Sequence, residues 1–139
     1  MEVRTVAVIG AGTMGAGIAQ VCAQSGWHTR IFDAFPNSLE NGIERIKSFW
    51  EKGIEKGKTT EKEKDEWSQN LVPCYEISKA LEGADLVIEA VPEIMELKKE
   101  IFLKIEKMAP EYSILATNTS SLPISEIANI TSCPERVIG

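Results

Sequence analysis

Short apolar runs alternate with longer amphipathic stretches along this chain. The short runs predict buried strands at 6–9, 29–33, 71–74, 86–89 and 113–117, with the start of another at 137–138. The longer stretches predict helices at 13–25, from Pro36 past Trp50, at about 94–108 and at 124–128. This alternation predicts an α/β fold, namely a doubly wound, mostly parallel sheet with helices on both faces.

One segment departs from the alternation. Residues 55–69 are dense in charges of both signs, and Gly53 and Gly57 interrupt the helical pattern next to them. We expect this segment to form an exposed, charged helical hairpin inserted into the fold.

The composition narrows the class of protein. The chain has 139 residues, enough for one domain with its own core, and a net charge of −6, which argues against a nucleic-acid partner. No apolar stretch approaches the roughly 18–20 residues of a membrane span, and the run at 6–9 is too short for a signal peptide. Cys22, Cys74 and Cys133 lie far apart, and the single histidine, His28, has no cysteine at metal-ligand spacing. We therefore expect a cytoplasmic protein with reduced thiols and no metal site.

The strongest local motif is a Gly-x-Gly-x-x-Gly loop between the first predicted strand and the first predicted helix. Its residues are Gly10, Ala11, Gly12, Thr13, Met14 and Gly15. In a dinucleotide-binding unit the first glycine permits the turn, the second lets the pyrophosphate approach the backbone, and the third lets the helix pack closely. The helix N-terminus adds free N–H groups and a positive dipole end. The motif in this context predicts a Rossmann-type dinucleotide site.

An acidic residue follows at the distance that such a site requires. Asp33 ends the second predicted strand, 18 residues after Gly15, where a carboxylate accepts hydrogen bonds from the adenosine ribose. The alternative is a cap of the turn before Pro36. A carboxylate would repel the 2′-phosphate of NADP, and Ala34 and Phe35 offer no arginine to bind it. The sequence therefore favours NAD over NADP as the cofactor.

Three blocks of this sequence resemble the 3-hydroxyacyl-CoA dehydrogenase family in order and spacing. They are VIGAGTMGAGIAQ at 8–20, DLVIEAVPE at 85–93 and ATNTSSLPI at 116–124. The resemblance covers essentially the whole chain. It implies an NAD-dependent oxidoreductase that interconverts 3-hydroxyacyl-CoA and 3-ketoacyl-CoA.

The resemblance also implies roles for individual residues. Ala90 and Glu93 would lie along the nicotinamide side of the NAD site, and Lys98, one helical turn beyond Glu93, would also reach the cofactor. Asn118 and Ser120 would contact the nicotinamide ribose and the substrate oxygen, with Ser120 assisting catalysis. The alternatives are a solvated charge for Lys98 and a polar turn that caps the next helix for Asn118 and Ser120.

The charged hairpin acquires a function from the same resemblance. In the family this region helps to hold the CoA moiety, and Lys56 and Lys58 are candidate contacts for the CoA phosphates. The alternative is a solvated charged surface.

The catalytic base is not found among the residues of this chain. His28 begins the second predicted strand, opposite the end where ligands bind. The family's histidine lies in a His-Phe-Phe-Asn-Pro motif just after the strand that Val137 begins. The resemblance thus implies that residues 1–139 are an NAD-binding domain, truncated before that histidine, its partner glutamate and a helical C-terminal domain that forms the homodimer. We expect this fragment alone to be inactive.

Two other functions remain open from the sequence. One is a stand-alone NAD-binding module without catalysis. The other is a related hydroxy-acid or sugar-acid dehydrogenase that shares the N-terminal motifs.

Overall fold

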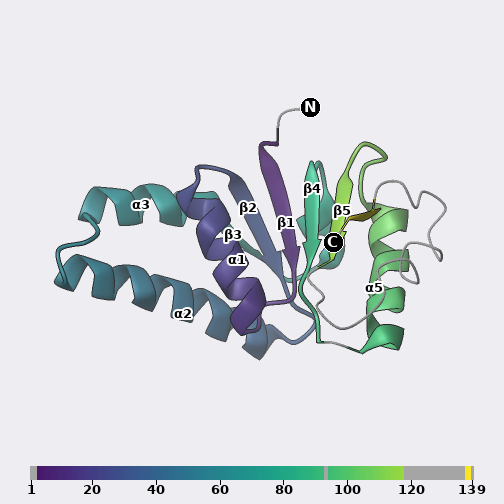
Figure 1. The fold of residues 1–139 in the computed structure, drawn as a ribbon, viewed down its shortest axis with the longest axis horizontal. Coiled ribbons are helices and arrows are strands. Elements are labelled where there is room, and N and C mark those ends of the chain that lie inside the picture. Colours follow the sequence, from purple (N-terminus) through teal and green to yellow (C-terminus); the bar gives the residue numbers. More distant parts are fainter. Residues whose placement is uncertain (1–2, 93, 118–136, 139) are drawn as a thin grey trace.

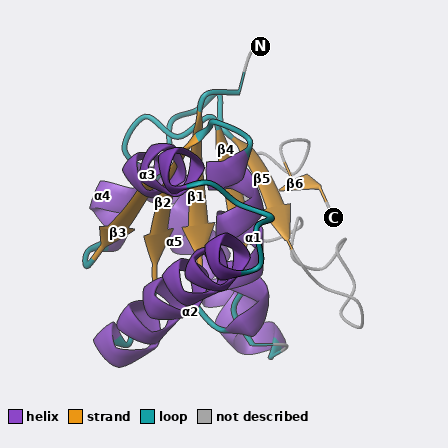
Figure 2. Ribbon diagram, turned by 90° about the vertical axis from the view of Figure 1, so that its left-hand side faces the viewer, coloured by secondary structure: helices purple, strands orange, loops and turns teal. Residues whose placement is uncertain are grey.

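A parallel sheet forms the centre of the molecule (Figures 1 and 2). The computed structural model describes residues 3–92, 94–117 and 137–138. Within these ranges the strand order is β3-β2-β1-β4-β5-β6, and every neighbouring pair is parallel. The strands are β1 Thr5–Ile9, β2 His28–Phe32, β3 Leu71–Cys74, β4 Leu86–Glu89, β5 Ile114–Thr117 and β6 Val137–Ile138. The strand order reverses between β1 and β4, which is where open α/β sheets bind ligands.

Helices cover both faces of this sheet. They are α1 Thr13–Gln24, α2 Pro36–Glu55, α3 Glu61–Asn70, α4 Ile77–Leu81 and α5 Met95–Met108. The hydrophobic core on one face contains residues of α1 and α2, with Trp67 of α3 packed against it, and the core on the other face contains residues of α4 and α5. The predicted doubly wound α/β fold is confirmed.

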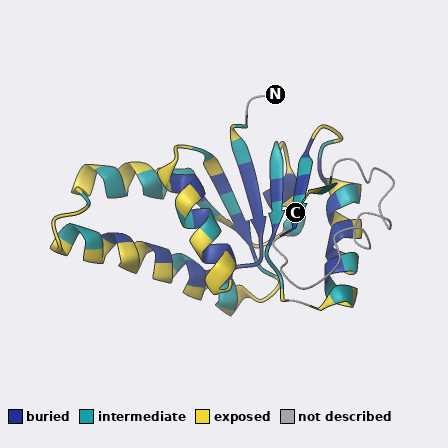
Figure 3. Ribbon diagram, viewed as in Figure 1, coloured by how far each residue is buried: buried dark blue, intermediate teal, exposed yellow. Residues whose placement is uncertain are grey.

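The central strand shows why the sheet needs two helical layers. Val6 and Val8 of β1 belong to the core beneath α1 and α2, whereas Ala7 and Ile9 belong to the core beneath α4 and α5. All four side chains are at most 1% exposed (Figure 3). A strand buried on both faces is typical of parallel sheets, and it explains the uninterrupted apolar run in the sequence.

The helical hairpin is longer than the charge pattern predicted. Residue 55 was expected to begin it, but α2 continues unbroken through Gly53 to Glu55 and forms the first arm, with α3 as the second (Figure 1). A glycine inside a helix costs only about 1 kcal/mol relative to alanine. Burial of Trp50, which is 1% exposed, offsets this cost. Its ring contacts Trp67 of α3 at 5.5 Å between centroids, and its indole N–H donates to Gln24 of α1.

Most other elements follow the sequence predictions to within a residue or two. The short helix α4 was not predicted, and the predicted helix at 124–128 lies outside the described residues. Cys22 and Cys74 are free and buried, and burial raises the pKa of both thiols, which suits inert cysteines. None of the helices in the described ranges is long and apolar enough to span a membrane.

The amino end of the sheet is fastened by a carboxylate. Asp85, just before β4, accepts hydrogen bonds from the backbone N–H groups of Arg4 (2.9 Å) and Thr5 (3.0 Å) at the start of β1. These two hydrogen bonds hold the pKa of the Asp85 carboxyl below its usual value. The contact joins the two strands that flank the reversal of strand order.

We predict that Asp85→Ala lowers the free energy of unfolding at pH 7 by about 1 kcal/mol, because two strand N–H groups lose a charged acceptor close to solvent. The folded-state pKa is depressed, so this stability is complete above the unfolded pKa of about 3.9 and is lost as pH falls through the folded value. Urea unfolding of both proteins should show a difference that is constant from pH 7 to 5 and shrinks below about pH 4. A difference that persists unchanged to pH 3 would contradict this account, and Asp65→Ala on the exposed face of α3 is the control.

Candidate functional site

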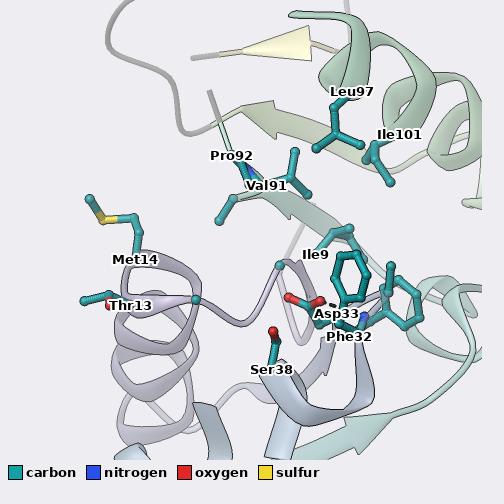
Figure 4. Close-up of a pocket in the computed structure, with 15 residues that line it drawn as sticks. Ile9, Thr13, Met14, Phe32, Asp33, Ser38, Val91, Pro92, Leu97 and Ile101 are labelled. Atoms are coloured by element: carbon teal, nitrogen blue, oxygen red, sulfur yellow. Dashed lines mark hydrogen bonds between the residues drawn. The ribbon is translucent and has the colours of Figure 1, made fainter. Parts of the chain in front are cut away.

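A cavity of about 570 Å³ opens at the carboxyl ends of β1, β2 and β4 (Figure 4). The glycine loop and the start of α1 line one side, with Asp33 directly after β2 and Ser38 in the first turn of α2. Val91, Pro92 and the α5 side chains Leu97 and Ile101 line the opposite side. The volume lies in the usual range for small-molecule sites.

The three motif glycines meet different surroundings. Gly10 has φ +114°, and a Cβ there would lie 2.5 Å from the carbonyl oxygen of Ala90. A Cβ at Gly15 would overlap the carbonyl oxygen of Gly10. A Cβ at Gly12 would meet no protein atom within 4 Å. The first and third glycines are therefore required by the protein itself, whereas the second leaves space open toward the cavity.

The first turn of α1 faces this open space. Gly12 is the N-cap and has no side chain to satisfy the helix N–H groups, and its carbonyl accepts from Ala16 at 2.9 Å. Thr13 and Met14, the next two residues, are exposed and line the cavity. An uncapped helix N-terminus presents N–H donors and a partial positive charge, which suits an anionic group such as a pyrophosphate.

Asp33 fixes the loop and also lines the cavity. It follows β2, which ends at Phe32, and its Oδ2 accepts from the N–H of Ala11 at 2.8 Å. Its Oδ1 accepts from the N–H of Phe35 at 2.9 Å, so the turn-capping role considered from the sequence is real. Each carboxylate oxygen has a second lone pair. The carboxylate is therefore able to accept from a ligand while holding the loop.

Lys98 is buried and forms an ion pair with a carboxylate. The side chain is 0% exposed, which excludes a solvated charge, and Lys98 is not among the residues that line the cavity. Its Nζ lies 2.9 Å and 2.7 Å from the two carboxylate oxygens of Glu89, which is also 0% exposed. The resemblance implied a contact between Lys98 and the cofactor, and in the structure the ammonium group contacts this buried carboxylate. Glu89 was missed as a site residue, although an acid that ends an apolar strand was its visible signal.

The other predicted residues separate into three groups. Ala90 lines the cavity. Glu93, Asn118 and Ser120 lie outside the described residues. Lys56 and Lys58 lie elsewhere on the described surface and do not line the cavity, and neither does His28, which was expected at the opposite end of the sheet.

Lys56 and Lys58 are exposed at the turn between α2 and α3. This turn is at the end of the hairpin remote from the cavity, because α2 extends about 26 Å from Ser38, which lines the cavity, to its end at Glu55 (Figure 1). His28 is exposed at the amino end of β2, opposite Asp33. Partial desolvation of its imidazole, and next the nearby charge of Arg30, lower the pKa of this group. Among the described residues, no three His, Cys, Asp or Glu side chains gather as metal ligands.

The strand order, the glycine loop that opens onto the cavity and the acid after β2 define a dinucleotide-binding domain of the Rossmann type. A family profile described as "3-hydroxyacyl-CoA dehydrogenase, NAD binding domain" matches residues 5–139. The chain belongs to this family, and its cofactor is NAD.

The relatives that match this chain are longer than it is. It is 44% identical over 142 residues to a probable 3-hydroxybutyryl-CoA dehydrogenase of Bacillus subtilis, covering all of this chain and 48% of that protein. It is 41% identical to a 3-hydroxyadipyl-CoA dehydrogenase of Escherichia coli, of which it covers 29%. The crystal structure of (S)-3-hydroxybutyryl-CoA dehydrogenase PaaH1 from Ralstonia eutropha matches 99% of this chain and 48% of that one, with a TM-score of 0.95 and 36% identity. The chain thus spans about half or less of the length of these relatives.

The space around Gly12 and the close contact at Gly15 predict different effects of alanine: at Gly12 on NADH binding, and at Gly15 on stability. Gly12→Ala should change the unfolding free energy of the free chain by less than about 1 kcal/mol. It should weaken NADH binding more than about tenfold, because the methyl group enters the space left for the ligand. Gly15→Ala should destabilise the free chain by about 2 kcal/mol, although alanine in an unobstructed helix would stabilise it. Urea unfolding and NADH titration measure both effects, and wild-type NADH binding by Gly12→Ala would show that the second glycine does not face the ligand.

Proposed function

We propose that this chain is the NAD-binding part of an enzyme that interconverts 3-hydroxyacyl-CoA and 3-ketoacyl-CoA. The observation that carries the proposal is the cavity onto which both the open side of Gly12 and the carboxylate of Asp33 face. The relatives' names supply the substrate class, since they include 3-hydroxybutyryl-CoA and 3-hydroxyadipyl-CoA dehydrogenases.

The cavity supports a specific placement of NAD. The N–H groups of Thr13 and Met14 suit the pyrophosphate, because α1 begins there without a side-chain cap. The free lone pairs of Asp33 suit the adenosine ribose hydroxyls, and its charge disfavours a 2′-phosphate. The ring of Phe35, 72% exposed beside Asp33, offers a flat apolar surface to adenine.

The nicotinamide end would then lie toward Ala90 and Val91, on the β4 side of the cavity. When bound there, NAD accepts or donates the hydride, while the protein supplies position and electrostatics. We keep Glu93 and Asn118 as further contacts to this half of the cofactor, and Ser120 as the hydrogen-bond partner of the reacting oxygen. We propose that Lys98 acts on this half of the site through its ion pair with Glu89.

The reaction also needs groups that the described residues do not supply. We propose that the base that takes the hydroxyl proton, the acyl pocket and a homodimer interface belong to a further domain, because the relatives extend over about twice this length or more. Lys56 and Lys58 remain candidates for the CoA phosphates, since both are exposed at the tip of the hairpin. A cytoplasmic location fits the buried free thiols of Cys22 and Cys74.

The proposal predicts how removing the negative charge of Asp33 changes cofactor choice. Asp33→Asn should weaken NADH binding about tenfold, because a charged acceptor for the ribose hydroxyls is lost. NADPH binding should weaken less than NADH binding, since the repulsion of its 2′-phosphate is also lost, and the preference for NADH therefore shrinks.

Calorimetric titration with each cofactor measures this preference, circular dichroism checks folding, and Asp65→Asn on α3 is the control. A folded wild-type chain that binds neither cofactor, or binds NADPH as tightly as NADH, would contradict the proposal.

A further inference from the structure

A single buried carboxylate joins three segments at the carboxyl edge of the sheet. Glu89, the last residue of β4, is 0% exposed. It contacts Lys98 of α5, Val91 of the loop between β4 and α5, and Thr117, the last residue of β5. These contacts lie beneath the loop that lines the cavity on the β4 side.

The hydrogen bonds to this carboxylate saturate it. Oε1 accepts from Lys98 Nζ at 2.9 Å and from Thr117 Oγ1 at 2.6 Å. Oε2 accepts from Lys98 Nζ at 2.7 Å and from the N–H of Val91 at 2.7 Å. A carboxylate offers about four lone-pair positions. Glu89 therefore has no acceptor position left for a ligand, and its function must be exerted through the groups that it holds.

The groups that it holds lie against the cavity. The N–H of Val91 donates to Glu89, and the carbonyl oxygen of Val91 lies 3.4 Å from Lys98 Nζ, so both backbone polar groups of this residue are held by the ion pair. The preceding residue is held from the other side, because the N–H of Ala90 donates to Ile9 of β1 at 2.8 Å. The carbonyl of Ala90 also lies against Gly10 of the glycine loop. The path of residues 90–91 is thus set by polar contacts on both sides.

Stability alone does not account for such a pair. Removing two charges from water is costly, and an apolar pair of similar volume commonly gives equal or greater stability. A fully satisfied buried network instead restricts the structure to one arrangement. The same network reaches Thr117, which directly precedes Asn118 in the sequence.

We propose that Glu89, with Lys98 and Thr117, is a positioning residue that sets the β4–α5 loop for the nicotinamide half of NAD. This inference rests on the proposed function. The adenosine half is assigned to other segments, namely the glycine loop and Asp33. Loss of the network should therefore weaken binding of the nicotinamide end and leave the adenosine end unchanged.

The test compares NADH with ADP-ribose, which lacks the nicotinamide, in titrations of the wild-type chain, Glu89→Gln and Thr117→Val. For Glu89→Gln we expect the Kd for NADH to rise about tenfold and the Kd for ADP-ribose to change less than about twofold. Thr117→Val keeps the ion pair and the size of the side chain, so it tests the network if Glu89→Gln does not fold. Its Kd for NADH should rise about threefold, with ADP-ribose unchanged.

A control variant separates this network from general charge effects. Glu100→Gln removes an exposed ion pair with Lys104 on the same helix, and it should bind both ligands as the wild type does. The inference is overturned if folded variants keep wild-type NADH affinity, or if NADH and ADP-ribose weaken equally, as a purely structural defect would cause. A wild-type chain that binds neither ligand would instead overturn the proposed function, and the inference with it.

Discussion

The approach of the glycine loop to the end of β4 is the contact on which the site depends. Gly10 turns out of β1 with a positive φ, and its α-carbon lies so close to the carbonyl of Ala90 that no side chain fits between them. The same turn places the carbonyl of Gly10 against Gly15, which brings the first turn of α1 close to the sheet. The uncapped N-terminus of α1 thereby lies beside the carboxyl ends of β1 and β4, and the cavity forms where the strand order reverses.

Two carboxylates at the ends of β2 and β4, the strands on either side of β1, have different roles because their surroundings differ. Asp33 follows β2, is partly exposed, and has one backbone donor on each oxygen, so it is able both to hold the loop and to accept from a ligand. Glu89 ends β4, is fully buried, and has all its acceptor positions occupied. The first supports recognition of a ribose, and the second supports the peptide backbone beside the nicotinamide end.

The sequence predicted those features that depend on local patterns. The apolar runs located the strands, since a strand buried on both faces, as β1 is, has a nearly continuous apolar sequence. The glycine spacing and Asp33 located the cavity. The extent of the hairpin was predicted less well, because burial of Trp50 against α1 and α3 carries α2 through Gly53. The position of Lys98 depends on Glu89 and Thr117, which lie 9 and 19 residues away in the sequence, and helical spacing alone does not reveal such a contact.

We propose that NAD binds in this cavity and not at the charged hairpin. Nuclear magnetic resonance of the ¹⁵N-labelled chain titrated with NAD⁺ tests this most directly. The account predicts that amide shifts concentrate at residues 10–15, at 33–35 and at 90–91, and that Lys56 and Lys58 at the hairpin turn do not shift. A folded chain whose amides do not respond, or respond mainly along α2 and α3, would contradict it.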